Sequence, residues 1–158
     1  MRAVYRSGQR VLRSCPVASA TVIAIGDGVY FNSGEVKPNA DYTWDTNLAT
    51  TQGTHAAAFW GIAVTPSAAG ETTNVQVDVS PESVYEVDMA SAAIDIGTPV
   101  GFAKASGNAL ENQKVVAATA TSCIGRAASD HQSATTRVRV TFASAYHTAS
   151  ANVNANVG

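Results

Sequence analysis

One short sequence pattern occurs twice in this chain of 158 residues, and it constrains the fold more than any other feature. Residues 71–79 read ETTNVQVDV and residues 134–142 read ATTRVRVTF, so two threonines, one polar residue and Val-x-Val recur in the same order. Valine alternating with polar residues is typical of a half-buried strand, because successive side chains point to opposite faces of a sheet. We therefore predict that residues 74–79 and 137–142 are strands at comparable places in the fold, with their valines buried.

The repeated ending belongs to a longer internal similarity. Residues 25–31 (IGDGVYF) align with residues 96–102 (IGTPVGF), and residues 61–77 align with residues 125–140 after one deletion. These matches keep their order, at offsets of 71, 64 and 63 residues. Three ordered matches favour a structural repeat over chance, and the spacing is too long for a solenoid, whose repeats span about 20–50 residues. We expect two related β-units packed in one domain.

The composition supports a mainly β fold. The chain has 3 leucines against 19 valines and 16 threonines, and leucine favours helices whereas valine and threonine favour strands. Glycine, proline and serine separate short apolar stretches, which is typical of a small β-sandwich or barrel. The candidate strands are residues 20–25, 28–32, 59–65, 74–79, 83–89, 99–104, 113–118, 122–127 and 137–142.

The chain divides into three parts. Residues 1–16 are interpreted as a basic N-terminal arm, residues 17–146 as the β-domain, and residues 147–158 as a C-terminal tail that is flexible or ordered only on a partner. A long polar insertion, residues 33–58, interrupts the β-domain. Loops longer than about 12–15 residues are often functional or disordered, so we expect one or the other here.

Charge is unevenly distributed along the chain. Residues 1–13 carry +4, residues 14–103 carry −9 and residues 104–158 carry +3, which gives the net charge of −2. The N-terminal charge comes from Arg2, Arg6, Arg10 and Arg13. Their spacings of four and three residues would place them on one face of a helix, should this segment become helical. An acidic body with a basic arm is typical of a protein that contacts a partner through that arm.

We predict that these four arginines contact an acidic protein surface. Nucleic acid is the less favoured partner, because an acidic body is repelled by phosphates. The alternative is a disordered N-terminus that makes no contact.

Residues able to carry catalysis or to bind a metal do not converge in the sequence. The candidates are His55, His131, His147, Asp27, Asp41 and Asp45. The histidines lack the spacing of a zinc site, and the aspartates lack that of a calcium-binding loop. Neither a phosphate-binding loop nor a nucleophile elbow is present. We therefore expect no catalytic site, no metal site, no cofactor and no enzymatic activity, and a small hydrolase is the least supported class.

The two cysteines and the hydropathy pattern exclude further classes. Cys15 and Cys123 form neither a metal-binding spacing nor a CxxC pair, and we expect buried or incidental thiols rather than a disulfide. The arginine-rich N-terminus lacks the continuous apolar run of a secretory signal. Nor does any stretch approach the roughly 20 apolar residues needed to cross a bilayer, so we expect no membrane partner.

The order of motifs in residues 59–142 resembles that of a known family. A Gly-Ile-Ala strand is followed by Ala-Ala-Gly-Glu-Thr and Val-x-Val, then by a second strand and Gly-Thr-Pro-Val at residues 97–100. An Ile-Gly-x-Ala segment at residues 124–127 precedes the closing Thr-Thr-x-Val-x-Val. This half of the chain is similar to the capsid cement (head decoration) proteins of tailed bacteriophages. The departures are the 33–58 insertion and the two terminal segments.

The resemblance implies a structural virion protein that binds the outer surface of the assembled head. Its partners would be the major capsid protein, whose subunit contacts it stabilises, and itself as a homo-oligomer, with a trimer favoured over a dimer. It would be made in the host cytoplasm and located on the outside of the capsid. Many symmetric copies multiply weak contacts, and binding only the assembled shell stabilises that shell by mass action.

The aromatic residues of the sequence also allow a second function. Tyr30, Tyr42, Trp44 and Trp60 could form a stacking platform in a receptor- or glycan-binding head domain of a virion fibre. Trp60 lies in an apolar run and fits a core position better. A shallow exposed aromatic groove would favour the glycan-binding head domain, and buried aromatic side chains would favour the cement protein.

Overall fold

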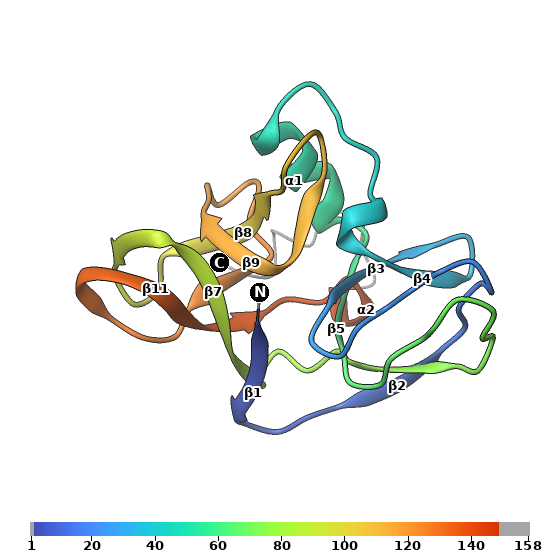
Figure 1. Cartoon of the computed structure of the whole chain (residues 1–158). Coiled ribbons are helices and arrows are strands. Elements are labelled where there is room, and N and C mark those ends of the chain that lie inside the picture. The colour runs from blue at the N-terminus through green and yellow to red at the C-terminus, as the bar shows by residue number, and fades with distance from the viewer. Residues whose placement is uncertain (1, 149–158) are drawn as a thin grey trace.

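The computed structural model describes residues 2–148 and consists of two β-sheets side by side (Figure 1). The strands of the second half form a closed barrel in the order β7-β11-β10-β8-β9. They are β7 (Val84–Ile94), β8 (Pro99–Lys104), β9 (Leu110–Ala117), β10 (Gly125–Ala127) and β11 (His131–Phe142). A parallel pairing of Asp88 with Lys114 brings β9 back to β7 and closes this C-terminal barrel. One further strand, β1 (Ala3–Ser7), pairs with the outer edge of β7.

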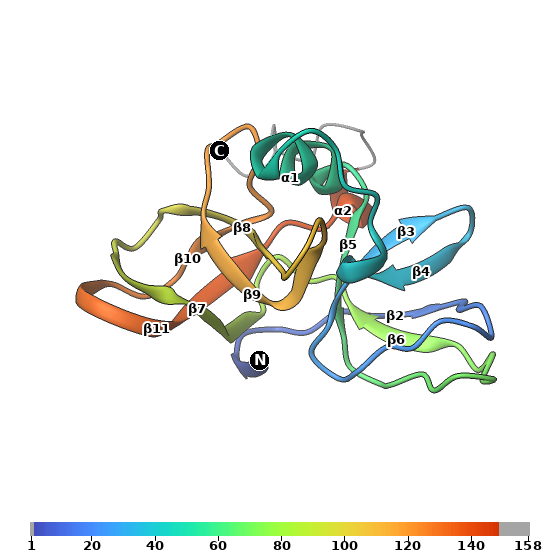
Figure 2. The same cartoon turned by 45° about the horizontal axis from the view of Figure 1, so that its top comes forward.

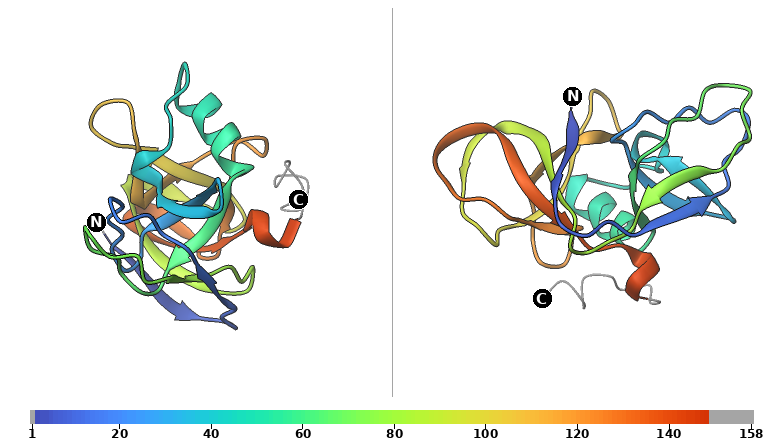
Figure 3. Two further views of the ribbon diagram at one scale, coloured as in Figure 1. Left: turned by 90° about the vertical axis from the view of Figure 1, so that its right-hand side faces the viewer. Right: turned by 90° about the horizontal axis from the view of Figure 1, so that it is seen from below.

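The strands of the first half form a second sheet in the order β2-β6-β5-β3-β4. They are β2 (Leu12–Cys15), β3 (Gly28–Asn32), β4 (Glu35–Pro38), β5 (Phe59–Ala63) and β6 (Val75–Asp78). This N-terminal sheet curls toward closure, because the Val36 N–H of β4 donates to the Pro16 carbonyl just after β2, at 2.9 Å. Figure 2 and Figure 3 show the two units from other sides.

The two units have the same topology. In chain order β2 to β6 correspond to β7 to β11, and the spatial order of the strands is the same in both sheets. The repeated endings are β6 and the last part of β11, and each is the second strand in the order of its own unit. Val75, Val77, Val138 and Val140 are all buried there. The predicted repeat and the predicted mainly β fold are both confirmed.

The equivalence extends to single hydrogen bonds. The Gly26 N–H donates to the Ala63 carbonyl in the N-terminal unit, as the Gly97 N–H donates to the Ala127 carbonyl in the C-terminal unit. The Ala63 N–H donates to the Asp27 carbonyl, as the Ala127 N–H donates to the Thr98 carbonyl. The Gln76 N–H donates to Thr65 Oγ1, as the Arg139 N–H donates to Ser129 Oγ. In each of these pairs of bonds, the two donors are aligned with each other in the sequence repeat, and so are the two acceptors. Chance similarity would not reproduce individual donors and acceptors, so the two units are copies of one structural plan.

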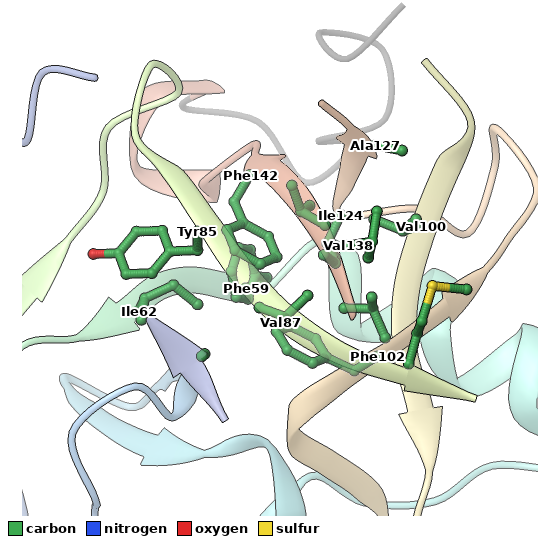
Figure 4. Packing of buried hydrophobic residues seen from close by; sticks show 14 of the residues in the cluster. Phe59, Ile62, Tyr85, Val87, Val100, Phe102, Ile124, Ala127, Val138 and Phe142 are labelled. Atoms are coloured by element: carbon green, nitrogen blue, oxygen red, sulfur yellow. The ribbon is translucent and has the colours of Figure 1, made fainter. Parts of the chain in front are cut away.

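The core of the C-terminal barrel is built around three stacked or tilted phenylalanine rings (Figure 4). Phe102 and Phe142 stack with centroids 5.9 Å apart, and Phe59 lies 5.5 Å from Phe102 and 5.6 Å from Phe142. Phe59 belongs to β5 of the N-terminal sheet, so one unit supplies a ring to the core of the other. A separate cluster of small side chains, mostly valines, fills the N-terminal sheet.

Residues 33–58 are not the structureless loop that their polar composition suggested. They contain β4, the short 3-10 helix η1 (Asn39–Asp41) and helix α1 (Leu48–Ala56), which lies at the top of Figure 1. Asn47 caps α1, since its Oδ1 accepts from the Thr50 N–H at 2.9 Å. Gln52 then ties the helix to the C-terminal barrel by donating to the Phe102 carbonyl at 2.8 Å.

The basic N-terminal segment is likewise not an arm that stands apart from the body. Most of residues 3–15 lie in strands β1 and β2, which pair with β7 and β6. The arginines therefore do not share a helix face. Gly8, at φ +94° and packed against the Glu82 carbonyl, ends β1 where a side chain would not fit.

The structure differs from the predicted strand at residues 20–25 and describes only the start of the predicted tail. Residues 20–25 form turns with one isolated bridge rather than a strand, because Ala24 and Asp27 hydrogen-bond to each other and bend the chain. The predicted tail begins with the end of helix α2 (Ala145–Thr148), and its remaining residues, 149–158, lie outside the described residues. Cys15 and Cys123 are both buried and are not joined in a disulfide.

A buried histidine in α1 makes the stability of the fold sensitive to acid. His55 is 1% exposed, its Nε2 lies 2.7 Å from Asn39 Oδ1, and its ring packs against Phe59 and Phe102. Burial lowers the pKa of His55 from 6.5 to about 3.

Acidification should therefore destabilise the protein through His55. Below pH 6.5 His55 is protonated in the unfolded chain, but in the folded chain it stays neutral until about pH 3. The free energy of unfolding therefore falls as the pH drops through this window. The loss attributable to His55 is about 2 kcal/mol between pH 6.5 and pH 5, measured as a change in urea unfolding. The variant His55→Asn should lose this part of the pH dependence, and His131→Gln should keep it. An unchanged pH dependence in His55→Asn would contradict the assignment.

Candidate functional site

The outer face of strands β1, β7 and β11 gathers arginines from both ends of the chain. Val87 and Val138 pair and point into the barrel, which leaves the alternate residues facing outward. Glu86 lies opposite Arg139, and Asp88 opposite Arg137. On the other side of β7, Arg6 contacts Glu86, and alternation along β1 places Arg2 on the same face. We call this surface the basic face; it consists of Arg2, Arg6, Glu86, Asp88, Arg137 and Arg139.

The carboxylates join Arg6 and Arg137 in a connected network. Arg6 donates to Glu86 at 2.7 Å, and Arg137 lies 3.5 Å from Asp88 and 3.9 Å from Glu86. The hydrogen bond from Arg6, with the charges of Arg137 and Arg139, holds the pKa of Glu86 below its usual value. Glu86 therefore stays ionised at neutral pH.

The basic face carries an excess of positive charge on an acidic protein. Its four arginines outnumber its two carboxylates, whereas residues 14–103 carry −9 in total. Beside it lies a shallow hollow of about 270 Å³, lined by Asp88, Met89, Glu111, Lys114, Thr136 and Arg137. Exposed ion pairs contribute little to stability, usually about 0–1 kcal/mol. The arginines can therefore exchange these partners for carboxylates on another molecule at small cost.

Arg10 and Arg13 lie away from the basic face. The Arg10 guanidinium stacks on Tyr5, 4.2 Å from the ring centroid, and its Nε lies 3.5 Å from the buried Asp78 carboxylate. Arg13 donates to the Tyr146 hydroxyl at 2.8 Å. The structure thus separates the four arginines singled out in the sequence into three places and brings only Arg2 and Arg6 together.

Sequence reasoning missed Arg137 and Arg139 as part of the site. They alternate with the buried Val138 and Val140, and both arginines are exposed on the outer face of the barrel. The site depends on the pairing of β7 with both β1 and β11, which joins residues between 37 and 84 positions apart in the sequence.

The four aromatic side chains considered for glycan stacking do not form one exposed platform. Tyr30 is 5% exposed and packs edge-on against Tyr42 at 5.0 Å. Trp60 stacks on Phe31 at 4.5 Å. Trp44 lies under Lys104, whose ammonium is 4.9 Å from the ring centroid.

Within residues 2–148, the structure brings together no group of three His, Cys, Asp or Glu side chains that could hold a metal ion. Neither α1 nor any other helix of this range is long and apolar enough to cross a bilayer.

Family models, curated proteins and solved structures all give no match.

Proposed function

We propose that this protein is a capsid cement protein that binds the outside of an assembled phage head and stabilises contacts between major capsid subunits. The observation that carries the proposal is the basic face, a charged sheet surface on an otherwise acidic protein. The motif order of residues 59–142 supports the same function. A body made of two copies of one β-unit, joined through a shared core, also suits a stiff structural component.

In this proposal the basic face docks on acidic side chains of the shell. Arginine forms planar, two-pronged contacts with carboxylates, and four of them in one sheet surface fix the orientation of the docked protein. Complementary charge speeds association and sets the salt dependence of binding. The protein acts as a homo-oligomer, with a trimer favoured, so that each oligomer bridges several capsid subunits and multiplies weak contacts.

The proposed function is tested by sedimentation with purified heads. The protein should co-sediment with intact heads and raise the temperature at which they disrupt, because it binds the assembled shell and not its parts. It should not bind the free capsid subunit with comparable affinity. Equal binding to free subunit, or no binding to heads, would rule out the cement function.

The site is tested by removing two charges from the basic face. The double variant Arg137→Ser/Arg139→Ser should bind heads at least about tenfold more weakly at low salt, where charges on exposed surfaces are screened least. The matched control is Lys37→Ser/Lys104→Ser, which removes the same charge from other surfaces. If both variants lost affinity equally, net charge rather than the basic face would govern attachment.

A further inference from the structure

Two carboxylates run down the middle of the basic face. Glu86 and Asp88 are two residues apart in β7, so they point to the same side of the sheet. The neighbouring strand β11 places Arg139 opposite Glu86 and Arg137 opposite Asp88. Residues directly opposite each other on antiparallel strands share one face, with their Cβ atoms about 5 Å apart. One column of cations therefore flanks the carboxylates on the β11 side.

A second column of cations flanks the same carboxylates on the other side of β7. Arg6 of β1 donates to Glu86 at 2.7 Å. Lys114 of β9 lies opposite Asp88 in the parallel pairing that closes the barrel, so its side chain points to the same face. Neighbouring strands lie about 4.8 Å apart, which separates the two cation columns by about 10 Å. The charge thus changes from positive to negative and back to positive across this surface.

The carboxylates lie deeper than the arginines. The side chains of Glu86 and Asp88 are 20% and 24% exposed, whereas those of Arg6 and Arg137 are 38% and 48% exposed. The guanidinium groups therefore stand above a negatively charged floor that solvent still reaches. An anion that approaches the arginines also meets the field of these two carboxylates.

This pattern favours some anionic partners over others. A protein carries its carboxylates at discrete places, so it can set them over the cation columns and set neutral groups over Glu86 and Asp88. Duplex nucleic acid carries one negative charge about every 1.7 Å along its axis and cannot leave such a gap. Some phosphates would lie over the carboxylates, within the screening length of about 10 Å at 0.1 M salt. Unfavourable contacts with a wrong partner contribute to specificity, as favourable contacts with the right one do.

We propose that Glu86 and Asp88 are specificity-determining residues of the basic face, which exclude nucleic acid and restrict the face to partners with separated carboxylates. The favoured partner is a protein surface with two columns of carboxylates about 10 Å apart. This partner chemistry rests on the proposed docking of the basic face, whereas the exclusion of nucleic acid can be measured without a phage head.

Fluorescence anisotropy with a labelled DNA duplex tests this role in the full chain. The probe is a duplex of mixed sequence, about 20 base pairs long, at about 50 mM salt, where phosphate contacts are strong. The double variant Glu86→Gln/Asp88→Asn should bind the duplex at least about tenfold more tightly than the parent protein, because the phosphates no longer meet negative charge between the cations. Its affinity should fall steeply with added salt, since binding releases counterions from the duplex.

The matched control is Glu71→Gln/Asp41→Asn, which removes the same two charges from exposed positions outside the basic face. Both double variants raise the net charge from −2 to 0. The control should gain less than about twofold in affinity, because its charges lie away from the arginines. A second test variant, Glu86→Gln alone, keeps an acceptor for Arg6 and should show a smaller gain in the same direction. Urea unfolding checks that each variant is folded.

Three results would overturn the proposal. Binding of the duplex by the parent protein as tightly as by Glu86→Gln/Asp88→Asn would show that the carboxylates do not exclude nucleic acid. An equal gain in the control would assign the effect to net charge. Absence of a gain in both folded test variants would mean that other parts of the surface repel the duplex. The assay contains no heads, so a failure of the cement function in sedimentation is a separate result.

Discussion

Replacement of Asp78 with alanine is expected to destabilise the protein by about 3–5 kcal/mol, because it breaks a buried charged network between the two units. The Asp78 carboxylate accepts hydrogen bonds from the Val11 and Ser80 N–H groups and from the Tyr85 hydroxyl, at 3.2, 3.0 and 2.8 Å. Arg10 supplies the opposing charge. Alanine would leave three donors and one cation without their acceptor, and each buried donor left unpaired costs about 1–3 kcal/mol.

Urea unfolding measures this effect, with Glu82→Ala as the matched control. Glu82 is an acidic residue of the same connection between β6 and β7, but it is exposed, so its loss should change the free energy of unfolding by less than about 0.5 kcal/mol. Tyr85→Phe removes one donor and should give an intermediate loss. A change below about 1 kcal/mol in Asp78→Ala would show that the network does not join the units.

The second large effect is expected at the two glycines of the repeated Gly-x-Ala motif. Gly61 and Gly125 lie at equivalent places in β5 and β10, and each packs directly against a backbone carbonyl of the neighbouring strand, that of Asp78 or Thr141. A methyl group at either position would overlap that carbonyl oxygen. The strands would have to separate, so Gly61→Ala and Gly125→Ala should each cost about 3 kcal/mol or more.

Gly53→Ala is the control for this pair. Gly53 lies in helix α1, and an added methyl group would meet its nearest neighbour at an ordinary contact distance of 3.6 Å. Alanine is the better helix former by about 1 kcal/mol, so this variant should be as stable as the parent or more so. Thermal unfolding compares the three variants directly. If Gly61→Ala and Gly125→Ala melted at the same temperature as Gly53→Ala, the close backbone contacts would not require glycine at positions 61 and 125.

Much of the β fold could be predicted from local pattern. The bounds of β3 and β8 agree with the predicted strands 28–32 and 99–104, because turn residues flank both and their apolar content is high. The internal repeat predicted equivalent positions for β6 and β11. Strand-forming residues and turns act over a few positions, and such signals are visible in the sequence itself.

The parts that were missed depend on long-range pairing or on weak local signals. The N-terminal arginines suggested an arm because charge dominates that segment, yet Ala3 and Cys15 are buried and anchor it to the two sheets. Helix α1 lacks an apolar face and is recognisable only by Asn47 at its start. The basic face required knowing that β1 and β11 flank β7, which no local pattern states.

The position of Phe59 also affects how the two units depend on each other for folding. Because β5 of one unit places this ring in the core of the other, a chain with a single unit would lack part of its interior. Because both units lie in one chain, the contact that completes this interior is intramolecular. Its formation therefore does not depend on protein concentration, as it would between two separate molecules.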